Sequence, residues 1–245
     1  YEPVRAPVFL FRQPMNNPSP FIDAPVLALV GPTAIGKTAL SLHLAERFNA
    51  EIISVDSMQV YRFMDIGTAK VTLEERARIP HHLIDVVDPD EEYDAACFVA
   101  DALRAIKEIH QRGKMALLTG GTGLYLRSLV YGLFTGIGQF PEIREQLQQR
   151  LLLDGSHKLH EELSLFDRDS AERIHVNDTH RLLRAIEVYQ ATGKPWSEHI
   201  AEHQLLKKPR FTNMLQIALT CDRDLLYRRI DLRTRIMLEN GLEQE

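Results

Sequence analysis

The sequence predicts an α/β protein, a doubly wound parallel sheet that carries an α-helical insertion. Three observations support this prediction. Apolar runs of strand length alternate with segments of helical periodicity, which is the order typical of a parallel sheet flanked by helices. A glycine-rich turn at 31–38 joins the first apolar run to the first helical segment. A long stretch from about 136 to 205 then has helical periodicity only.

The elements of the predicted sheet follow in order along the chain. Four apolar runs have the length of buried strands: 26–30, 52–55, 115–119 and 214–220. Apolar spacings of three and four residues predict helices at 37–48, about 94–111, 124–130 and about 222–240. In the second of these, Phe98, Ala102 and Ile109 share one face, as a helix packed on a sheet requires.

The helical stretch at 136–205 is interpreted as an insertion between two strands. Its helical patterns occupy four segments: 141–153, 156–166, 169–174 and 179–192. Asp178 or Thr179 would cap the last of these, and Gly193 with Pro195 would end it. Because no strand pattern interrupts the stretch, the core would comprise 26–135 and 206–245.

Residues 1–25 contain six of the twelve prolines of the chain. The apolar segment 8–11 is too short for a signal-peptide core. We interpret residues 1–25 as an extended, poorly structured lead-in. We also expect Met15 to be the natural first residue and residues 1–14 to have been added for expression; a native mass that includes them would contradict this.

The bulk composition limits the classes of partner. The 245 residues carry a net charge of −5, which argues against indiscriminate binding to nucleic acid or to an anionic membrane. Any polyanion must therefore be held by local arginines. No apolar stretch approaches the length of a membrane span. Cys97 and Cys221 lie far apart and outside any Cys-x-x-Cys pattern, so we expect small core residues in a reducing, cytoplasmic protein.

The turn after the first strand spells a phosphate-binding loop in the setting that the motif requires. Strand, turn and helix follow one another, so backbone N–H groups and the positive end of the helix would face a diphosphate or triphosphate. Lys37 would reach the outer phosphates and the Thr38 hydroxyl would hold Mg²⁺. The loop consists of Gly31, Pro32, Thr33, Ala34, Ile35, Gly36, Lys37 and Thr38.

Asp56 follows directly after the second predicted strand. Ligands of open α/β sheets collect at the carboxyl ends of strands, so this carboxylate should face the same crevice as the phosphate loop. It could accept a proton from a nucleophile or hold Mg²⁺ through water. The alternative is a helix cap for 57–62.

The third strand ends in a Gly-Gly-Thr-Gly turn at 120–123. Its glycines permit close backbone approach, and Thr122 could cap the following helix or bond a substrate. The strand ends in Thr119, whereas motor-type ATPases place an acidic residue there for Mg²⁺. Power-stroke nucleotide hydrolysis is therefore disfavoured.

Arginines concentrate in the last predicted helix. Arg229 and Arg233 lie one turn apart, so they could neutralise a departing pyrophosphate or form a solvated helix face. In the insertion, Arg181 and Arg184 are spaced to suit two adjacent backbone phosphates. The pair His81-His82 suggests a metal site, but no third ligand has suitable spacing, so we expect a structural role.

In order along the chain, these motifs resemble those of the bacterial tRNA dimethylallyltransferases. The matching blocks are 31–38, 53–61, 64–70, 80–85, 120–125, Asn177 and Asp178 with Arg181 and Arg184, and 229–233. The family prenylates N6 of the adenine 3′ of the anticodon in tRNA and releases diphosphate. Its members continue beyond the position of Glu245 with a basic, tryptophan-containing segment that touches tRNA and ligand.

The resemblance implies a P-loop kinase-like sheet and a helical insertion, 136–205, that grips the anticodon stem-loop. Asp56 would be the catalytic base, assisted by Thr38 and Arg233. The 31–38 loop would hold the diphosphate of dimethylallyl diphosphate with Mg²⁺. The implied enzyme is cytoplasmic, monomeric and without membrane contact. The implied tRNA contacts are Asp56, Ser57, Met58, Gln59, Thr122, Arg144, His180, Arg181, Leu182, Leu183 and Arg184.

Three other functions use a similar loop. An adenylate isopentenyltransferase would apply the same base to a free nucleotide, although the 64–70 block fits the tRNA enzymes better. A small-molecule kinase would use Asp56 to activate a hydroxyl. A non-catalytic nucleotide-binding module would not need Asp56 beside the loop.

Overall fold

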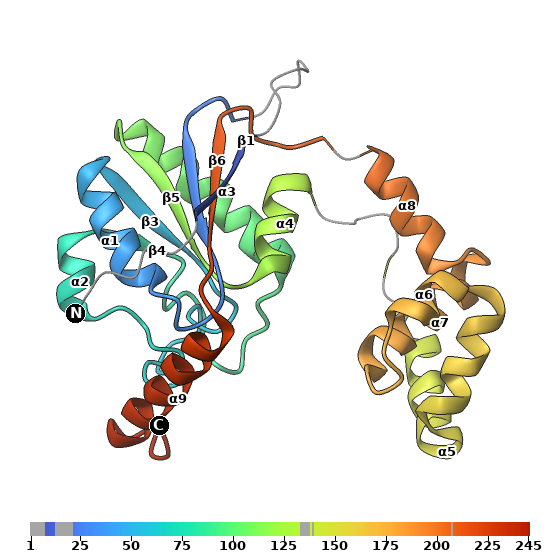
Figure 1. Ribbon diagram of the computed structural model, residues 1–245. Helices are drawn as coiled ribbons and strands as arrows, with labels where there is room; N and C mark the ends of the chain where they lie inside the picture. The colour runs from blue at the N-terminus through green and yellow to red at the C-terminus, as the bar shows by residue number, and fades with distance from the viewer. Residues whose placement is uncertain (1–7, 13–21, 133–137, 139, 207) are drawn as a thin grey trace. The chain divides into compact units, whose positions relative to one another are not determined.

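The computed structural model describes residues 8–12, 22–132, 138, 140–206 and 208–245 (Figure 1). The chain divides into two compact units. The sheet unit comprises Tyr1–Leu133 and Pro209–Glu245, and the helical unit comprises Phe134–Lys208. These limits lie close to the expected limits of the insertion, 136 and 205.

The described strands of the sheet unit form one sheet in the order β1-β6-β2-β5-β3-β4. Strands β6, β2, β5, β3 and β4 run parallel, which confirms the predicted doubly wound parallel sheet. Edge strand β1 pairs antiparallel with β6. The strands are β1 Val8–Arg12, β2 Val26–Val30, β3 Ala50–Val55, β4 His81–His82, β5 Met115–Gly120 and β6 Met214–Leu219.

Strand β1 corrects one prediction. Residues 8–12 were expected to belong to a poorly structured lead-in, but their backbone pairs with β6 from Val8 opposite Leu219 to Arg12 opposite Leu215. The apolar run that was too short for a signal peptide has the length of a strand. Ile22, also within the expected lead-in, bridges Phe211, and its N–H donates to the Arg210 carbonyl oxygen at 3.3 Å. Residues 1–7 and 13–21 lie outside the described residues, and so does the expectation about Met15.

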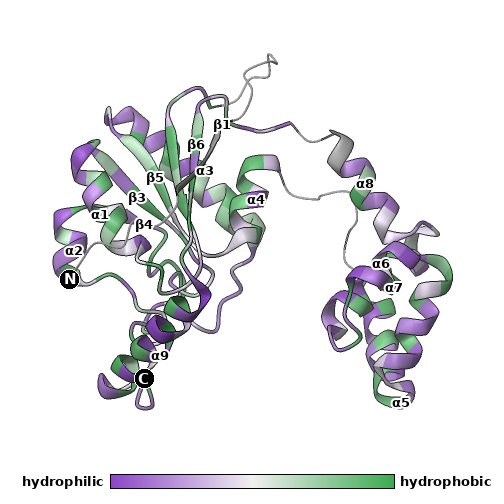
Figure 2. Cartoon of the chain, in the orientation of Figure 1, coloured by the Kyte–Doolittle hydropathy of each residue, from purple (hydrophilic) through white to green (hydrophobic). Residues whose placement is uncertain are grey.

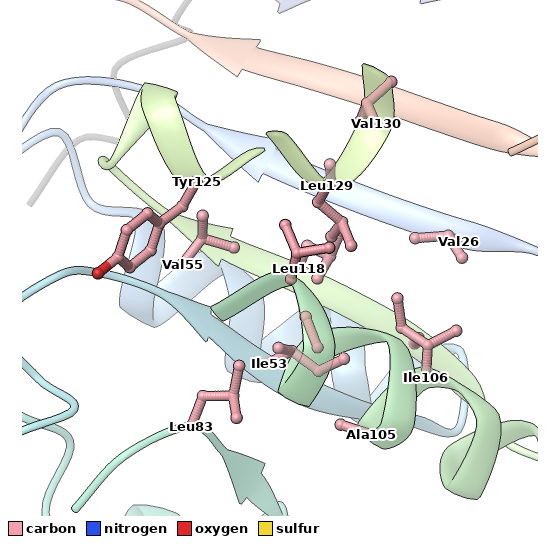
Figure 3. Packing of buried hydrophobic residues seen from close by; sticks show 14 of the residues in the cluster. Val26, Ile53, Val55, Leu83, Ala105, Ile106, Leu118, Tyr125, Leu129 and Val130 are labelled. Atoms are coloured by element: carbon pink, nitrogen blue, oxygen red, sulfur yellow. The ribbon is translucent and has the colours of Figure 1, made fainter. Parts of the chain in front are cut away.

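Successive residues of each central strand point to opposite faces of the sheet and pack in two different core clusters. Val26 and Ala28 of β2 pack in a cluster with Ile53 and Leu118, whereas Leu27 and Leu29 pack in a second cluster on the other face. Figure 3 shows Val26, Ile53 and Leu118 pointing toward Ile106. A strand that is buried on both faces is continuously apolar. This explains why these runs could be recognised in the sequence.

Helices cover both faces of the sheet. Leu42 and Ala45 of α1 belong to one core cluster, whereas Phe98 of α3 and Leu129 of α4 belong to the other. The predicted helices at 37–48, 94–111, 124–130 and 222–240 are confirmed. The short α2 and the two-residue β4 were not predicted. The helices of the sheet unit are α1 Lys37–Arg47, α2 Leu73–Arg78, α3 Ala95–Gln111, α4 Gly123–Tyr131 and α9 Arg223–Glu239.

The helical unit has its own core, built from Leu147, Leu159, Leu163 and residues of α7. Gly155 interrupts α5 with φ 80° and ψ 163°, which confirms the predicted division into 141–153 and 156–166. Helix α8 was not predicted because it begins directly after the Gly193–Pro195 stop signal. The helices are α5 Pro141–Phe166, α6 Arg168–Arg173, α7 Thr179–Thr192 and α8 Trp196–Leu206.

Hydrophobic residues are concentrated along β2, β3 and β5, and are mixed with hydrophilic residues along α9 (Figure 2). Within the described ranges, no helix is long and apolar enough to cross a membrane.

Glu51 at the start of β3 is a buried carboxylate with three basic partners. Its side chain is 3% exposed and bonds Arg112 at 2.6 Å, His82 at 2.7 Å and Lys114 at 3.1 Å. Burial alone would raise the pKa of Glu51, but the hydrogen bonds from Arg112, His82 and Lys114 outweigh it and lower the pKa to about 2. The ordinary value is 4.5, so folding stabilises the ionised form.

We expect this lowered pKa to appear as acid sensitivity. The stabilisation by Glu51 is fully present above pH 4.5 and is lost as the pH falls toward about 2. A difference of two to three pKa units corresponds to about 3 kcal/mol. Glu51→Gln should therefore lower the free energy of unfolding at pH 7 by about 3 kcal/mol and flatten its decline below pH 5, measured by urea titration.

The control is Glu46→Gln. Glu46 pairs with Arg78, but both side chains are exposed, at 44% and 59%. An exposed pair contributes about 0–1 kcal/mol. Equal losses in the two variants would contradict the assignment to the Glu51 cluster.

Candidate active site

A cavity of about 650 Å³ lies at the carboxyl ends of the strands, within the sheet unit. The 33–39 segment forms one wall, and Asp56 with Gln59 forms another. Arg229 and Arg233 of α9 complete the lining. The structure thus brings together the phosphate loop, the predicted base and the predicted arginines.

The phosphate loop is shaped by glycines and by the start of α1. Gly36, the N-cap residue of α1, has φ 101°, a left-handed conformation that favours glycine. Because Gly36 has no side chain, it cannot cap the first N–H groups of α1, which are therefore available to a ligand. A Cβ on Gly31 would lie 2.8 Å from the Leu219 carbonyl oxygen, so glycine is needed there for close approach to β6. The Ile35 side chain is buried in the core, and only its backbone belongs to the loop.

Lys37 folds back over the loop. Its ammonium donates to the carbonyl oxygens of Gly31 and Pro32, each at 2.8 Å. Burial lowers the pKa of Lys37, Asp56 opposes this effect, and Arg233 adds to it. The charges of Lys37, Asp56 and Arg233 are therefore close enough to interact across the cavity. Thr38 is exposed and its hydroxyl can serve a ligand.

Asp56 lies at the tip of β3 and lines the cavity. Its Oδ1 accepts hydrogen bonds from the N–H groups of Met58 at 2.9 Å and Gln59 at 3.2 Å. These bonds hold a turn, since 57–62 does not form a helix and the capping alternative is wrong. Among the described residues, both hydrogen bonds to this carboxylate are accepted by Oδ1. Oδ2 can therefore accept a proton from a ligand.

The turn after β5 approaches β3 very closely. A Cβ on Gly120 would lie 2.1 Å from the Val55 carbonyl oxygen. Thr122 Oγ1 accepts from the Ser57 N–H at 3.1 Å, so this side chain fixes the segment after Asp56. Thr122 precedes α4 but makes no side-chain cap, and the capping role considered for it is wrong.

The two arginines of α9 reach the rim of the cavity. An Arg229 guanidinium nitrogen lies 3.4 Å from the Ile35 carbonyl oxygen, and one of Arg233 lies 3.4 Å from that of Thr68. Their predicted location on one side of the helix, beside the phosphate loop, is confirmed.

The 64–70 segment contributes residues to which the sequence assigned no role. Thr68 and Ala69 line the cavity. Gln59 Nε2 donates to the carbonyl oxygens of Thr68 at 3.2 Å and Ala69 at 3.4 Å. Lys70, 2% exposed, bonds Asp65 and Asp85, which joins the 64–70 and 80–85 blocks. Both blocks are among the motifs that this sequence shares with the tRNA dimethylallyltransferases. That shared presence was the signal in the sequence that could have indicated a common site.

Four of the six residues expected to contact tRNA in the helical unit fall into two groups. His180 and Arg181 at the start of α7 are exposed. Leu182 and Leu183 are 0% and 4% exposed and belong to the core. Their side chains pack in the core of the helical unit with residues of α5, so a contact of these two residues with tRNA would come from their backbone.

Arg144 and Arg184 both serve a buried carboxylate. Glu187 is 3% exposed and pairs with Arg184 at 2.8 Å and Arg144 at 3.3 Å. It also accepts from the Phe140 N–H at 3.0 Å. The two guanidinium groups, 22% and 24% exposed, therefore connect α7 with the start of α5 before any ligand is considered.

The histidine pair and the cysteines have other surroundings. His82 bonds Glu51, and His81 Nδ1 lies 2.7 Å from the Ile79 carbonyl oxygen, as a structural role requires. The described residues contain no cluster of three side chains suited to a metal ion. Cys97 is exposed, so the expectation of a core residue is wrong for it. Cys221 is half-buried and packs against a core cluster beside the cavity.

A glycine-rich loop and a strand-tip carboxylate lie around one cavity of a P-loop-like α/β fold. The family model described as IPP transferase matches residues 59–245, and the model described as isopentenyl transferase matches residues 24–84. The chain belongs to the IPP transferase family.

Relatives and solved structures agree with this assignment. A tRNA dimethylallyltransferase of Desulfotalea psychrophila is 56% identical over 91% of this chain and 71% of its own length. That of Bacillus subtilis is 45% identical over 94% of this chain and 72% of its own length.

Two solved structures share the fold. The tRNA isopentenylpyrophosphate transferase of Bacillus halodurans is 43% identical with a TM-score of 0.59, over 90% of this chain and 68% of that chain. A eukaryotic dimethylallyltransferase acting on tRNA is 34% identical with a TM-score of 0.72, over 91% of this chain and 55% of that chain. The sequence-based assignment to the tRNA dimethylallyltransferases is confirmed.

Proposed function

We propose that this chain transfers the dimethylallyl group from dimethylallyl diphosphate to N6 of the adenosine 3′ of the anticodon in tRNA, releasing diphosphate. The observation that carries the proposal is the shared cavity of the 33–38 loop, Asp56 and Arg233. It combines a site for a diphosphate, a group that can accept a proton and positive charge for the leaving group.

In the proposed reaction, N6 attacks the first carbon of the prenyl group. The N–C bond forms while the bond from that carbon to the diphosphate oxygen breaks, and its electrons go to the diphosphate. The amine becomes acidic as it is alkylated, and Asp56 Oδ2 accepts the proton. Loop N–H groups, Lys37 and Arg233 stabilise the charge that grows on the diphosphate.

The cavity also offers apolar surface for the prenyl chain. Val71, Ile84, Leu232 and Ile236 line it together with the charged groups. An apolar wall beside a charged end suits a donor with a five-carbon chain on a diphosphate.

Mg²⁺ is proposed to accompany the diphosphate, and the residues present fit it. Mg²⁺ prefers oxygen ligands and usually takes only one or two from protein in addition to phosphate oxygens. The Thr38 hydroxyl and, through water, the Asp56 carboxylate supply such oxygens at the cavity. When bound, the ion would neutralise charge on the diphosphate.

The adenine is proposed to enter from the opposite side of the glycine turn. A second cavity, of about 320 Å³, shares Gly120 and Gly121 with the first and is otherwise lined by Pro32, Val55, Thr122 and other mostly apolar groups. A planar base fits such a slot once it is turned out of its stack, which costs a few kcal/mol and is cheapest in a loop. The anticodon loop is therefore a suitable target.

The tRNA contact of the helical unit is proposed to rest on exposed charge. Arg181, 74% exposed, pairs with Asp178 at 3.2 Å and can turn to a phosphate. Arg181→Ala should weaken tRNA binding about three- to tenfold and reduce the slope of log affinity against log salt by about 1. Arg181→Lys keeps the charge and should keep the slope. An unchanged slope in Arg181→Ala would contradict the contact.

Arg184→Ala should act differently. Removal of this guanidinium leaves the buried Glu187 with Arg144 as its one charged partner, beside the Phe140 N–H, so we expect the free energy of unfolding of the helical unit to fall by about 2 kcal/mol. Thermal unfolding of the two variants separates these effects: Arg181→Ala should unfold like wild type. A normal midpoint for Arg184→Ala would show that the buried pair contributes no stability.

One labelling experiment tests the proposed function. Labelled dimethylallyl diphosphate is offered with unmodified tRNA, with AMP and alone, and ATP is offered with hydroxyl acceptors. Label on tRNA alone supports the proposal. Label on AMP would select the adenylate isopentenyltransferase, and phosphate transfer would select the kinase.

A further inference from the structure

The Glu245 side chain occupies an anion nest made by the 64–70 segment. Its Oε1 accepts from the N–H groups of Asp65 at 2.6 Å and Ile66 at 2.7 Å, and its Oε2 accepts from that of Gly67 at 2.9 Å. Consecutive N–H groups that converge in this way bind anions. The hydrogen bonds from Gly67 and Ile66 lower the pKa of Glu245, so the carboxylate is ionised at neutral pH.

A tight turn after α9 brings Glu245 to this nest. Gly241 has φ 97°, and the Glu245 N–H donates to its carbonyl oxygen at 3.2 Å. The Leu242 side chain of this turn lies against Gly67, since a Cβ on Gly67 would lie 2.9 Å from Leu242 Cδ1. The turn and the nest are therefore in direct contact.

Helix α9 packs against the core through Leu226 near its start, but its end has few other contacts. None of its residues, all of them described, is buried. Arg229 and Arg233 reach carbonyl oxygens at 3.4 Å, which is long for a hydrogen bond. The three bonds to Glu245 are shorter and charge-assisted, so they are the strongest polar link between the end of α9 and the rest of the sheet unit.

The nest is in turn fixed to the sheet. Lys70 bonds Asp65 at 2.7 Å and Asp85 at 2.6 Å from a position that is 2% exposed. Gln59, which follows the tip of β3, donates to the Thr68 carbonyl oxygen, the same oxygen that Arg233 approaches. A continuous set of polar contacts thus runs from β3 through the 64–70 segment to α9.

We propose that Glu245 is a positioning residue that ties the end of α9 to the Asp65–Ile66–Gly67 nest and thereby holds Arg233 against the diphosphate of the donor. Glu245 does not touch the reacting groups; it acts through Arg233. The inference rests on the proposed function in that the anion at Arg233 is the donor's diphosphate.

The test uses inorganic pyrophosphate with Mg²⁺ as the probe and calorimetry as the measurement. Loss of a set of charge-assisted bonds leads us to expect about tenfold weaker binding in Glu245→Ala, with a smaller loss in Glu245→Gln. In the transfer assay, kcat/KM for the donor should fall by a similar factor while the Kd for tRNA stays unchanged. Glu243→Ala removes an exposed carboxylate two residues earlier and should behave as wild type.

A double-mutant cycle with Arg233→Ala separates positioning from general stability. If Glu245 acts through Arg233, Glu245→Ala should have little further effect on pyrophosphate binding in the Arg233→Ala background. Pyrophosphate affinity within twofold of wild type in Glu245→Ala, or the same tenfold loss in both backgrounds, would overturn the proposal. Because pyrophosphate binding needs no prenyl transfer, the cycle can be measured even if the labelling experiment refutes the proposed function.

Discussion

Asp56→Asn should reduce the single-turnover rate of prenyl transfer about 10³-fold, within the range that a general base contributes. The asparagine amide cannot take the proton from N6. It keeps an oxygen at the Oδ1 position, which can still accept from the Met58 and Gln59 N–H groups. The turn after β3 should therefore persist, and the Kd for tRNA should stay within about twofold of wild type.

Asp56→Ala provides the comparison. It removes both the base and the acceptor that holds the turn, so transfer should be lost and some donor affinity with it. The difference in donor affinity between Asp56→Ala and Asp56→Asn measures how much the turn contributes to donor binding. Transfer by Asp56→Asn at more than a tenth of the wild-type rate would mean that another group accepts the proton.

Gly120→Ala should have the largest effect on stability. The added Cβ would lie 2.1 Å from the Val55 carbonyl oxygen, a backbone atom of the neighbouring strand, so β3 and β5 must separate. We expect the free energy of unfolding to fall by at least about 4 kcal/mol, beyond ordinary overpacking. Because Val55 immediately precedes Asp56, any protein that still folds should also transfer poorly.

Gly123→Ala is the matched control from the same turn. An added Cβ at Gly123 meets nothing within 4 Å, and the residue begins α4. Alanine is the better helix former, so the unfolding free energy should change by less than about 1 kcal/mol. Urea titrations of both variants decide the matter; equal stability would show that the glycine at 120 is not required for strand approach.

The sheet could be predicted because burial leaves a local signal. Runs such as 26–30 are apolar at every position since both faces are covered, and helices α1 and α3 carry one apolar face each. The sequence around β1 gives no sign of its pairing, because its partner β6 lies about 200 residues further along the chain. Strand β4 has only two residues, which is too short for an apolar run or an alternating pattern to be recognised in the sequence.

The site could be predicted only in part. The phosphate loop and Asp56 follow from a motif and from the rule that ligands collect at strand ends. Local sequence cannot distinguish Arg181, which is exposed, from Arg184, which pairs with Glu187. Nor can it reveal that Glu245 bonds the Asp65 N–H, because that contact depends on the turn after α9.

If the phosphate loop, Asp56 and Arg233 surround one prenyl donor, a crystal structure of the protein with Mg²⁺ and a thiodiphosphate analogue of the donor should show it. We expect the diphosphate on the N–H groups of the 33–38 loop, in contact with Lys37 and Arg233, with the first prenyl carbon on the Asp56 side. An analogue bound elsewhere, or one whose prenyl group points away from Asp56, would rule out this arrangement.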